Sequence, residues 1–144
     1  LRQEQLEEMI RSTGFFRNKA KNILGAAQMI VHDFQGEIPK DIKTLTKLPG
    51  FGRKTANVIV TALYGINQGV TVDTHVLRLS KRLGLTDFQD AIKVERDLME
   101  LTPQKNWHEV SHFLILHGRR VCPARMPKCD ICTLNKICPS YQKT

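Results

Sequence analysis

The four cysteines of this 144-residue chain lie within seventeen consecutive residues near its C-terminus. They follow the pattern C-x6-C-x2-C-x5-C and are Cys122, Cys129, Cys132 and Cys138. A C-x2-C pair lets two thiolates bind one metal centre from a tight turn, and two flanking cysteines complete a set of four. Zinc and a [4Fe–4S] cluster both accept four thiolates, so the spacing predicts a metal site without choosing the metal. Two disulfides are less favoured, because a helical core of this size needs no cross-links.

The loop between the first two cysteines, residues 123–128, is basic and contains two prolines. Attachment of both ends to a metal would stiffen this loop, and the prolines restrict it further. Arg125 and Lys128 would then be held outward at a small entropic cost, which suits contact with phosphate groups. The alternative is a basic loop that is simply solvated.

The segment 48–54 reads Leu-Pro-Gly-Phe-Gly-Arg-Lys and lies between two stretches of helical periodicity. Its proline disfavours helix at the preceding residue, and Gly50 and Gly52 allow the dihedral angles of a hairpin. A glycine hairpin lets backbone N–H groups approach phosphate oxygens, and the next helix presents its positive N-terminus to the same anion. Arg53 and Lys54 add cations where the helix dipole already disfavours them, which indicates function rather than stability. A plain turn between helices is the alternative.

Lys54 is also a candidate nucleophile. An amine attacks carbon only when deprotonated, and nearby positive charge, the helix N-terminus and partial burial all favour the neutral form. A neutral lysine can attack a sugar C1′, expel the base and remain as a Schiff base. Asp73, at the start of another predicted helix, can stabilise positive charge on the sugar or deprotonate the attacking group. Its alternative role is the N-cap of that helix, and both roles are compatible because a capping carboxylate keeps one oxygen free.

Helical periodicity dominates the chain and predicts an all-α fold. Apolar residues recur at steps of three and four over residues 17–34, which is the stripe of an amphipathic helix. Further helices are predicted over residues 41–47, 53–64, 74–83, 89–101 and 103–117, and only residues 69–72 resemble an extended segment. Because the chain changes character near residue 69, we expect two domains, residues 1–68 with the hairpin and residues 69–144 with the cysteines.

The chain is basic, with twenty-two Lys and Arg against fourteen Asp and Glu and a formal charge of +8. This balance favours a polyanionic partner because neutralised phosphates release counterions, although a merely soluble basic protein has the same balance. No apolar run approaches the roughly 18 residues of a membrane helix, so no membrane partner is expected. Six basic residues face one acid over residues 119–144, namely Arg119, Arg120, Arg125, Lys128, Lys136 and Lys143.

Three segments and the cysteine pattern together resemble a known family. The segments are 48–58 (Leu-Pro-Gly-Phe-Gly-Arg-Lys-Thr-Ala-Asn-Val), 72–75 (Val-Asp-Thr-His) and 114–119 (Leu-Ile-Leu-His-Gly-Arg). They closely resemble the endonuclease III family of helix–hairpin–helix DNA glycosylases, over essentially the whole chain. The resemblance implies a helix–hairpin–helix glycosylase barrel lobe followed by a helical iron–sulfur lobe. Family members carry a further segment before the residues that match Leu1, so we expect an N-terminally truncated barrel lobe.

The resemblance also implies roles for the chemical groups. It makes Lys54 the nucleophilic lysine and Asp73 the catalytic aspartate. It makes the four cysteines the ligands of a [4Fe–4S] cluster, which shapes the basic loop and does not itself excise the base. Adenine glycosylases, a sister branch, resemble this pattern but lack the lysine, so Lys54 argues against that branch.

Residues 14–19 (Gly-Phe-Phe-Arg-Asn-Lys) match the family loop whose hydrophobic residue wedges into the duplex. The resemblance makes Phe15 the candidate wedge and Asn18 and Lys19 candidate DNA contacts. The alternative for Phe15 is a core aromatic residue that precedes a helix.

The family acts on oxidised pyrimidines in double-stranded DNA, flipping the damaged nucleotide out of the duplex. It then cleaves the glycosidic bond and breaks the strand by β-elimination, so abasic sites are also substrates. The leading interpretation is a monomeric, intracellular, nucleoid-associated glycosylase and abasic-site lyase of base excision repair. One alternative is a non-catalytic DNA-binding module of the same fold, and another is a metal-stabilised regulator that binds protein.

Overall fold

The computed structural model describes residues 1–141, and the last three residues, with Lys143, lie outside it. Over that range the chain forms α-helices and short 3-10 turns with no strand, which confirms the predicted all-α class. None of the helices in this range is long and apolar enough to span a bilayer. The helices are α1 (Gln3–Met9), α2 (Phe16–Asp33), α3 (Ile42–Leu45), α4 (Arg53–Tyr64), α5 (Thr74–Arg82), α6 (Ala91–Leu101) and α7 (Trp107–Arg120), with 3-10 turns η1 (Gln104–Asn106) and η2 (Cys129–Ile131).

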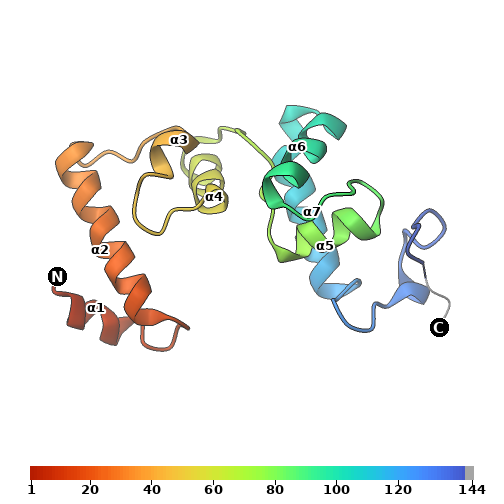
Figure 1. Ribbon diagram of the computed structural model, residues 1–144, viewed down its shortest axis with the longest axis horizontal. Coiled ribbons are helices and arrows are strands. Elements are labelled where there is room, and N and C mark those ends of the chain that lie inside the picture. Colours follow the sequence, from red (N-terminus) through yellow and green to blue (C-terminus); the bar gives the residue numbers. More distant parts are fainter. Residues whose placement is uncertain (142–144) are drawn as a thin grey trace. The chain divides into compact units, whose positions relative to one another are not determined.

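The chain separates into two compact units, residues 1–60 and the residues from 61 onward. The first unit places its core among α2, α3 and α4, while α1 packs along α2 (Figure 1). Asp41 begins α3, because its Oδ1 accepts a hydrogen bond of 2.8 Å from the backbone N–H of Thr44. The core residues are Ala26, Ile42, Leu45, Leu48, Ala56 and Val60. This packing fixes where α4 starts after the hairpin.

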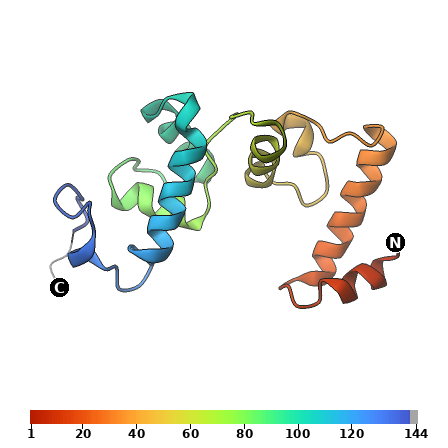
Figure 2. The ribbon, with the colours of Figure 1, turned by 180° about the vertical axis from the view of Figure 1, so that it is seen from behind.

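The second unit is built on α5 packed against α7, with α6 beside α5 (Figure 2). Carboxylates cap two of its helices: Asp73 accepts from the first turn of α5 and Asp90 from that of α6. The predicted helix over residues 103–117 is a 3-10 turn followed by α7, which continues to Arg120. The core residues are Val70, Val76, Leu79, Val94, Leu98 and Leu114. The division into domains at residue 69 remains a prediction.

Candidate nucleic-acid interface and cysteine site

The hairpin between α3 and α4 is held close to α2 by one glycine. Gly50 has a φ of +77°, and a Cβ built there would lie only 2.8 Å from Cβ of Asn22. Any side chain at position 50 therefore meets both backbone strain and a collision with α2. Gly52 differs, because its φ is not positive and a Cβ there would have no neighbour within 4 Å. The backbone conformation and the contact with α2 therefore require glycine at position 50. At position 52 they do not, and the space beside Gly52 is open to an approaching molecule.

Helix α4 begins immediately after the hairpin and turns two cations outward. Its first backbone hydrogen bond runs from the N–H of Ala56 to the carbonyl of Gly52, at 3.0 Å. Arg53 and Lys54 occupy the first turn, and both side chains are exposed. The partial burial expected for Lys54 is therefore not found in this unit.

Phe15 is the N-cap residue of α2 and lies in the left-handed region, with φ 57° and ψ 32°. Its side chain is 89% exposed, so the alternative of a core aromatic residue is wrong for this unit. A bulky residue with positive φ is unusual and costs about 1–3 kcal/mol. Asn18 and Lys19 follow in the first turn of α2 and are also exposed. The structure thus places the three residues of the predicted DNA-contact loop at one end of α2.

Asp73 is the N-cap residue of α5, which is the alternative role that the sequence suggested for it. Its Oδ1 accepts hydrogen bonds from the backbone N–H groups of His75 at 2.8 Å and Val76 at 2.9 Å. The side chain is half-buried. Within residues 1–141 both hydrogen bonds go to Oδ1, so Oδ2 of the carboxylate stays available for chemistry. Asp73 belongs to the second unit and Lys54 to the first.

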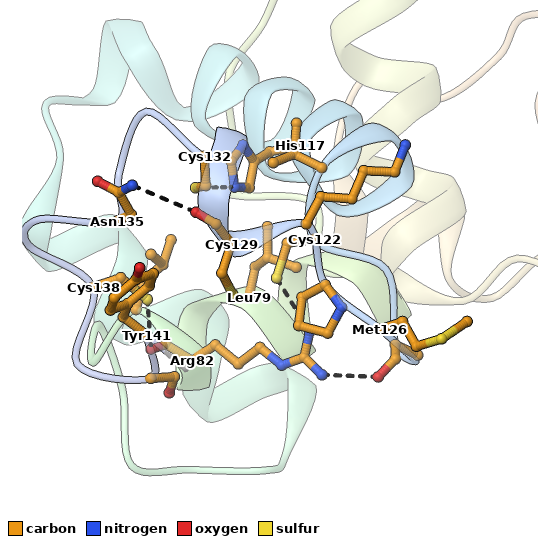
Figure 3. Close-up of a pocket in the computed structure, with 16 residues that line it drawn as sticks. Leu79, Arg82, His117, Cys122, Met126, Cys129, Cys132, Asn135, Cys138 and Tyr141 are labelled. Atoms are coloured by element: carbon orange, nitrogen blue, oxygen red, sulfur yellow. Dashed lines mark hydrogen bonds between the residues drawn. The ribbon is translucent and has the colours of Figure 1, made fainter. Parts of the chain in front are cut away.

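All four cysteines line one cavity of about 360 Å³ in the second unit (Figure 3). All four are half-buried and none forms a disulfide, which excludes the disulfide alternative in this structure. Within the part of the chain that is described, no three side chains of His, Cys, Asp or Glu gather around a single point. The four cysteines nevertheless share the lining of this one cavity.

Arg82 anchors the start of the cysteine loop from α5. It donates to Cys122 Sγ at 3.1 Å, to the carbonyl of Pro123 at 2.8 Å and to that of Ala124 at 2.9 Å. One helical turn earlier, Arg78 donates to the carbonyl of Cys122 at 2.9 Å. Figure 3 shows the Arg82 side chain extended past Cys122 toward this loop. The shape of the loop thus depends on cations about forty residues away in sequence.

His117 of α7 also belongs to this site. Its Nε2 lies 3.5 Å from Cys132 Sγ, and the ring lines the same cavity. Sequence reasoning did not identify Arg78, Arg82 or His117. No local pattern marks these three residues, because their partners in the cysteine segment lie 15 to 44 residues away in the sequence.

Beyond Cys122 the loop turns sharply and presents its cations. Met126 has a φ of 51° and is 87% exposed, so the loop tip is a left-handed turn at the edge of the cysteine cavity, which Met126 also lines. Arg125 and Lys128, on either side of it, are exposed as well. Lys128 closes the loop, since its backbone N–H donates to the carbonyl of Val121 at 2.9 Å. The two predicted phosphate-binding side chains are therefore accessible.

A glycine hairpin between helices, followed by a cysteine-lined cavity in a second helical unit, defines a helix–hairpin–helix protein with a thiolate site. The family model described as "HhH-GPD superfamily base excision DNA repair protein" matches residues 1–104. The chain belongs to this family.

Among curated proteins, the chain is 57% identical over 139 residues to Endonuclease III of Synechocystis sp. and 46% identical over 141 residues to that of Bacillus subtilis. These matches cover 96% and 97% of this chain but only 64% of each relative, so the chain spans about two thirds of their length. A trapped covalent intermediate of Endonuclease III with DNA matches with a TM-score of 0.92 and 43% identity, over 98% of this chain and 66% of that one. A thermostable thymine-DNA glycosylase, at 22% identity and TM-score 0.83, shares the fold.

Proposed function

We propose that this chain carries the catalytic residues of a bifunctional DNA glycosylase and abasic-site lyase that removes oxidised pyrimidines. The observation that carries the proposal is Lys54, an exposed amine on the first turn of α4 directly after the hairpin. The covalent DNA intermediate trapped with a 43% identical protein supports a reaction through a protein nucleophile. Double-stranded DNA with a damaged pyrimidine or an abasic site is the proposed substrate, bound by a monomer within the cell.

The neutral amine of Lys54 attacks C1′ of the damaged nucleotide, and the bond from C1′ to the base breaks with the electron pair leaving on the base. The attacking nitrogen loses its proton, the sugar ring opens at the C1′–O4′ bond, and a protonated Schiff base results. Loss of a proton from C2′ then expels the 3′ phosphate by β-elimination. Water releases the lysine from the sugar.

Asp73 is proposed as the catalytic aspartate of this reaction. A carboxylate stabilises positive charge that develops on the sugar and accepts the proton that the attacking nitrogen releases. The N-cap hydrogen bonds to Oδ1 fix the orientation of the group while they leave Oδ2 available. Its capping and chemical roles therefore do not compete.

The cavity in the second unit is proposed to hold a [4Fe–4S] cluster on the four cysteines. Four thiolates are the ligand set of such a cluster, and the four cysteines that line this cavity would hold it. The Arg82 guanidinium beside Cys122 Sγ adds a hydrogen bond of the kind that stabilises cluster sulfur. When bound, the cluster would stiffen the loop that carries Arg125 and Lys128. Base excision needs no step at the cluster.

DNA contact is proposed at three places: the hairpin with Gly50, Gly52 and Arg53, the end of α2 with Phe15, Asn18 and Lys19, and the cysteine loop with Arg125 and Lys128. Phe15 is proposed to fill the space that a flipped nucleotide leaves in the duplex. Its exposure and strained backbone support this role, because packing within the unit does not account for them. The cations supply affinity independent of sequence.

Borohydride reduction in the presence of abasic or thymine-glycol DNA tests the proposal. The wild-type chain should form a covalent protein–DNA adduct, and Lys54→Ala should reduce its yield by at least about 10³-fold. Lys47→Ala, which removes an exposed lysine just before the hairpin, is the matched control and should leave the yield unchanged. DNA binding without any wild-type adduct would support the non-catalytic module, and an adduct in Lys54→Ala would assign the chemistry to another amine.

Salt dependence of binding tests the DNA contacts separately. Log affinity should fall linearly with log salt, and Arg125→Ala and Lys128→Ala should each reduce the slope by about one. An affinity that does not change with salt would favour the protein-binding regulator.

A further inference from the structure

Helix α7 carries a pair of histidines that the proposed repair function does not use. Its residues 108–112 read His-Glu-Val-Ser-His, so two imidazoles stand four positions apart on one helix. We propose that His108 and His112 together bind a divalent first-row transition-metal ion such as Zn²⁺ or Ni²⁺, at a site separate from the cysteines. The proposal does not depend on the glycosylase function or on the cluster.

The geometry of the two rings fits a chelate. Side chains at positions i and i+4 lie on the same face of a helix, with Cβ atoms about 5–6 Å apart. The rings of His108 and His112 are stacked, with centroids 6.3 Å apart and planes inclined by 20°. A bound ion needs each nitrogen about 2.0–2.1 Å away, so the two rings must rotate toward each other to bind the same ion. Imidazole is a preferred ligand of zinc, nickel and copper.

Both rings are free to make these rotations. His108 and His112 are exposed, and no hydrogen bond of either ring is found within residues 1–141. The nearest aromatic neighbour, Phe113, is itself 64% exposed and lies 6.5 Å from His112 between ring centroids. Side chains in such positions change rotamer rapidly, and the helix backbone keeps the two rings within reach of each other. The site therefore needs no rearrangement of the fold.

The sequence of this site matches the H-E-x-x-H pattern of zinc peptidases, but its structure does not provide their chemistry. Glu109 is one residue along the helix from His108 and so points about 100° away from it. Among the described residues no third His, Cys, Asp or Glu joins the pair. Water would fill the remaining coordination positions, which makes the site exchangeable instead of structural or hydrolytic.

The site is distinct from the cysteine cavity, although α7 contributes to both. His117, nine residues after His108, lines that cavity, whereas neither His108 nor His112 does. Metal at the pair can therefore be distinguished from metal at the cysteines by which imidazole responds.

Titration of the anaerobically purified 144-residue chain with Ni²⁺, followed by NMR of the five histidine rings, tests the proposal. Paramagnetic broadening should reach His108 and His112 together, at a lower Ni²⁺ concentration than it reaches His32. His32 is the internal control, because it is an exposed histidine on α2 without a histidine four residues away. In His108→Ala, broadening of His112 should need about 10²-fold more Ni²⁺, since two linked ligands gain about that factor over one.

Two further variants make the result specific. Glu109→Ala should leave the titration unchanged, and His32→Ala should not alter broadening of His108 and His112. The proposal is overturned if His112 broadens at the same Ni²⁺ concentration with and without His108, or if His32 responds together with the pair. It is also overturned if Glu109→Ala weakens binding as much as His108→Ala does, because the carboxylate would then be a ligand. Unchanged amide spectra of the variants confirm that the helix is intact.

Discussion

The hairpin at residues 48–54 and the cysteine loop at residues 122–129 both present exposed cations, yet they are held in different ways. The hairpin is fixed by its own backbone and by its close approach to α2 at Gly50. The cysteine loop is fixed by donors on α5, above all Arg82, and by sulfur atoms around a cavity. The hairpin should therefore keep its shape without a cofactor, whereas the loop should require one.

Removal of iron should produce the largest difference between the two regions. Metal binding to thiolates contributes directly to folding free energy, so chelation should cost the second unit several kcal/mol and lower its melting midpoint by more than about 10 °C. Trp107 is the one tryptophan of the chain and lies in this unit, so its fluorescence reports the transition. Amide hydrogen exchange of the hairpin should stay the same. An unchanged Trp107 transition after proven loss of iron would contradict the proposed dependence.

Loss of the arginine anchor should have the next largest effect. Arg82→Met removes three hydrogen bonds from a charged donor and leaves two loop carbonyls without it, which should cost about 3 kcal/mol. Cluster release, followed by the loss of visible absorbance, should become faster. Arg119→Met, an exposed arginine in the last turn of α7, is the matched control and should behave like wild type. Equal cluster lifetimes in the two variants would show that Arg82 does not hold the loop.

Substitution of the two hairpin glycines by alanine should affect different properties, stability at Gly50 and DNA binding at Gly52. Gly50→Ala should destabilise the first unit by about 2 kcal/mol, because it adds a Cβ at positive φ against Asn22. Gly52→Ala should stay within about 0.5 kcal/mol of wild type in urea unfolding, yet weaken DNA binding where a phosphate approaches the backbone. A stability loss in Gly52→Ala as large as in Gly50→Ala would show that both glycines serve the fold alone.

The smallest effect should come from the cap of α3, which precedes the hairpin. Hydrogen bonds from the backbone N–H and the side chain of Thr44 hold the pKa of the Asp41 carboxyl below its ordinary value of 3.8. The stabilisation is present above that ordinary value and is lost as pH falls through the lower pKa of the folded state. Asp41→Ala should cost about 1 kcal/mol at neutral pH. Asp41→Asn should keep most of the cap and remove this pH dependence, and urea unfolding measured between pH 2 and 7 checks both expectations.

The features that the sequence predicts correctly are those set by neighbouring residues, as in the hairpin. Helix α2 is predicted to within one residue at each end, and the hairpin and the cap at Asp73 follow from neighbouring residues. These features are local, so periodicity, proline, glycine and capping chemistry suffice to find them. The bonds from Arg82 to Cys122 and from His117 to Cys132 join residues distant in sequence, and no local pattern encodes them.

The exposure of the Phe15 side chain also could not be predicted from the neighbouring residues. An aromatic residue before an amphipathic helix fits a core position equally well, and only the left-handed backbone at Phe15 turns the ring outward. The spacing of the cysteines likewise predicts a thiolate site, but the arrangement of the sulfur atoms around a cavity requires the fold of the whole second unit. The exposure of Phe15 and the arrangement of the cysteines both depend on tertiary structure, which hydrophobic periodicity does not determine.

The approach of Gly50 to Asn22 has a consequence for how this sequence can change over time. With a Cβ at position 50 only 2.8 Å from Asn22, a substitution at either position alters the room left at the other. Descendants of this gene should therefore accept bulk at position 22 only where position 50 remains glycine. Drift at one site in α2 is thus coupled to a turn almost thirty residues downstream.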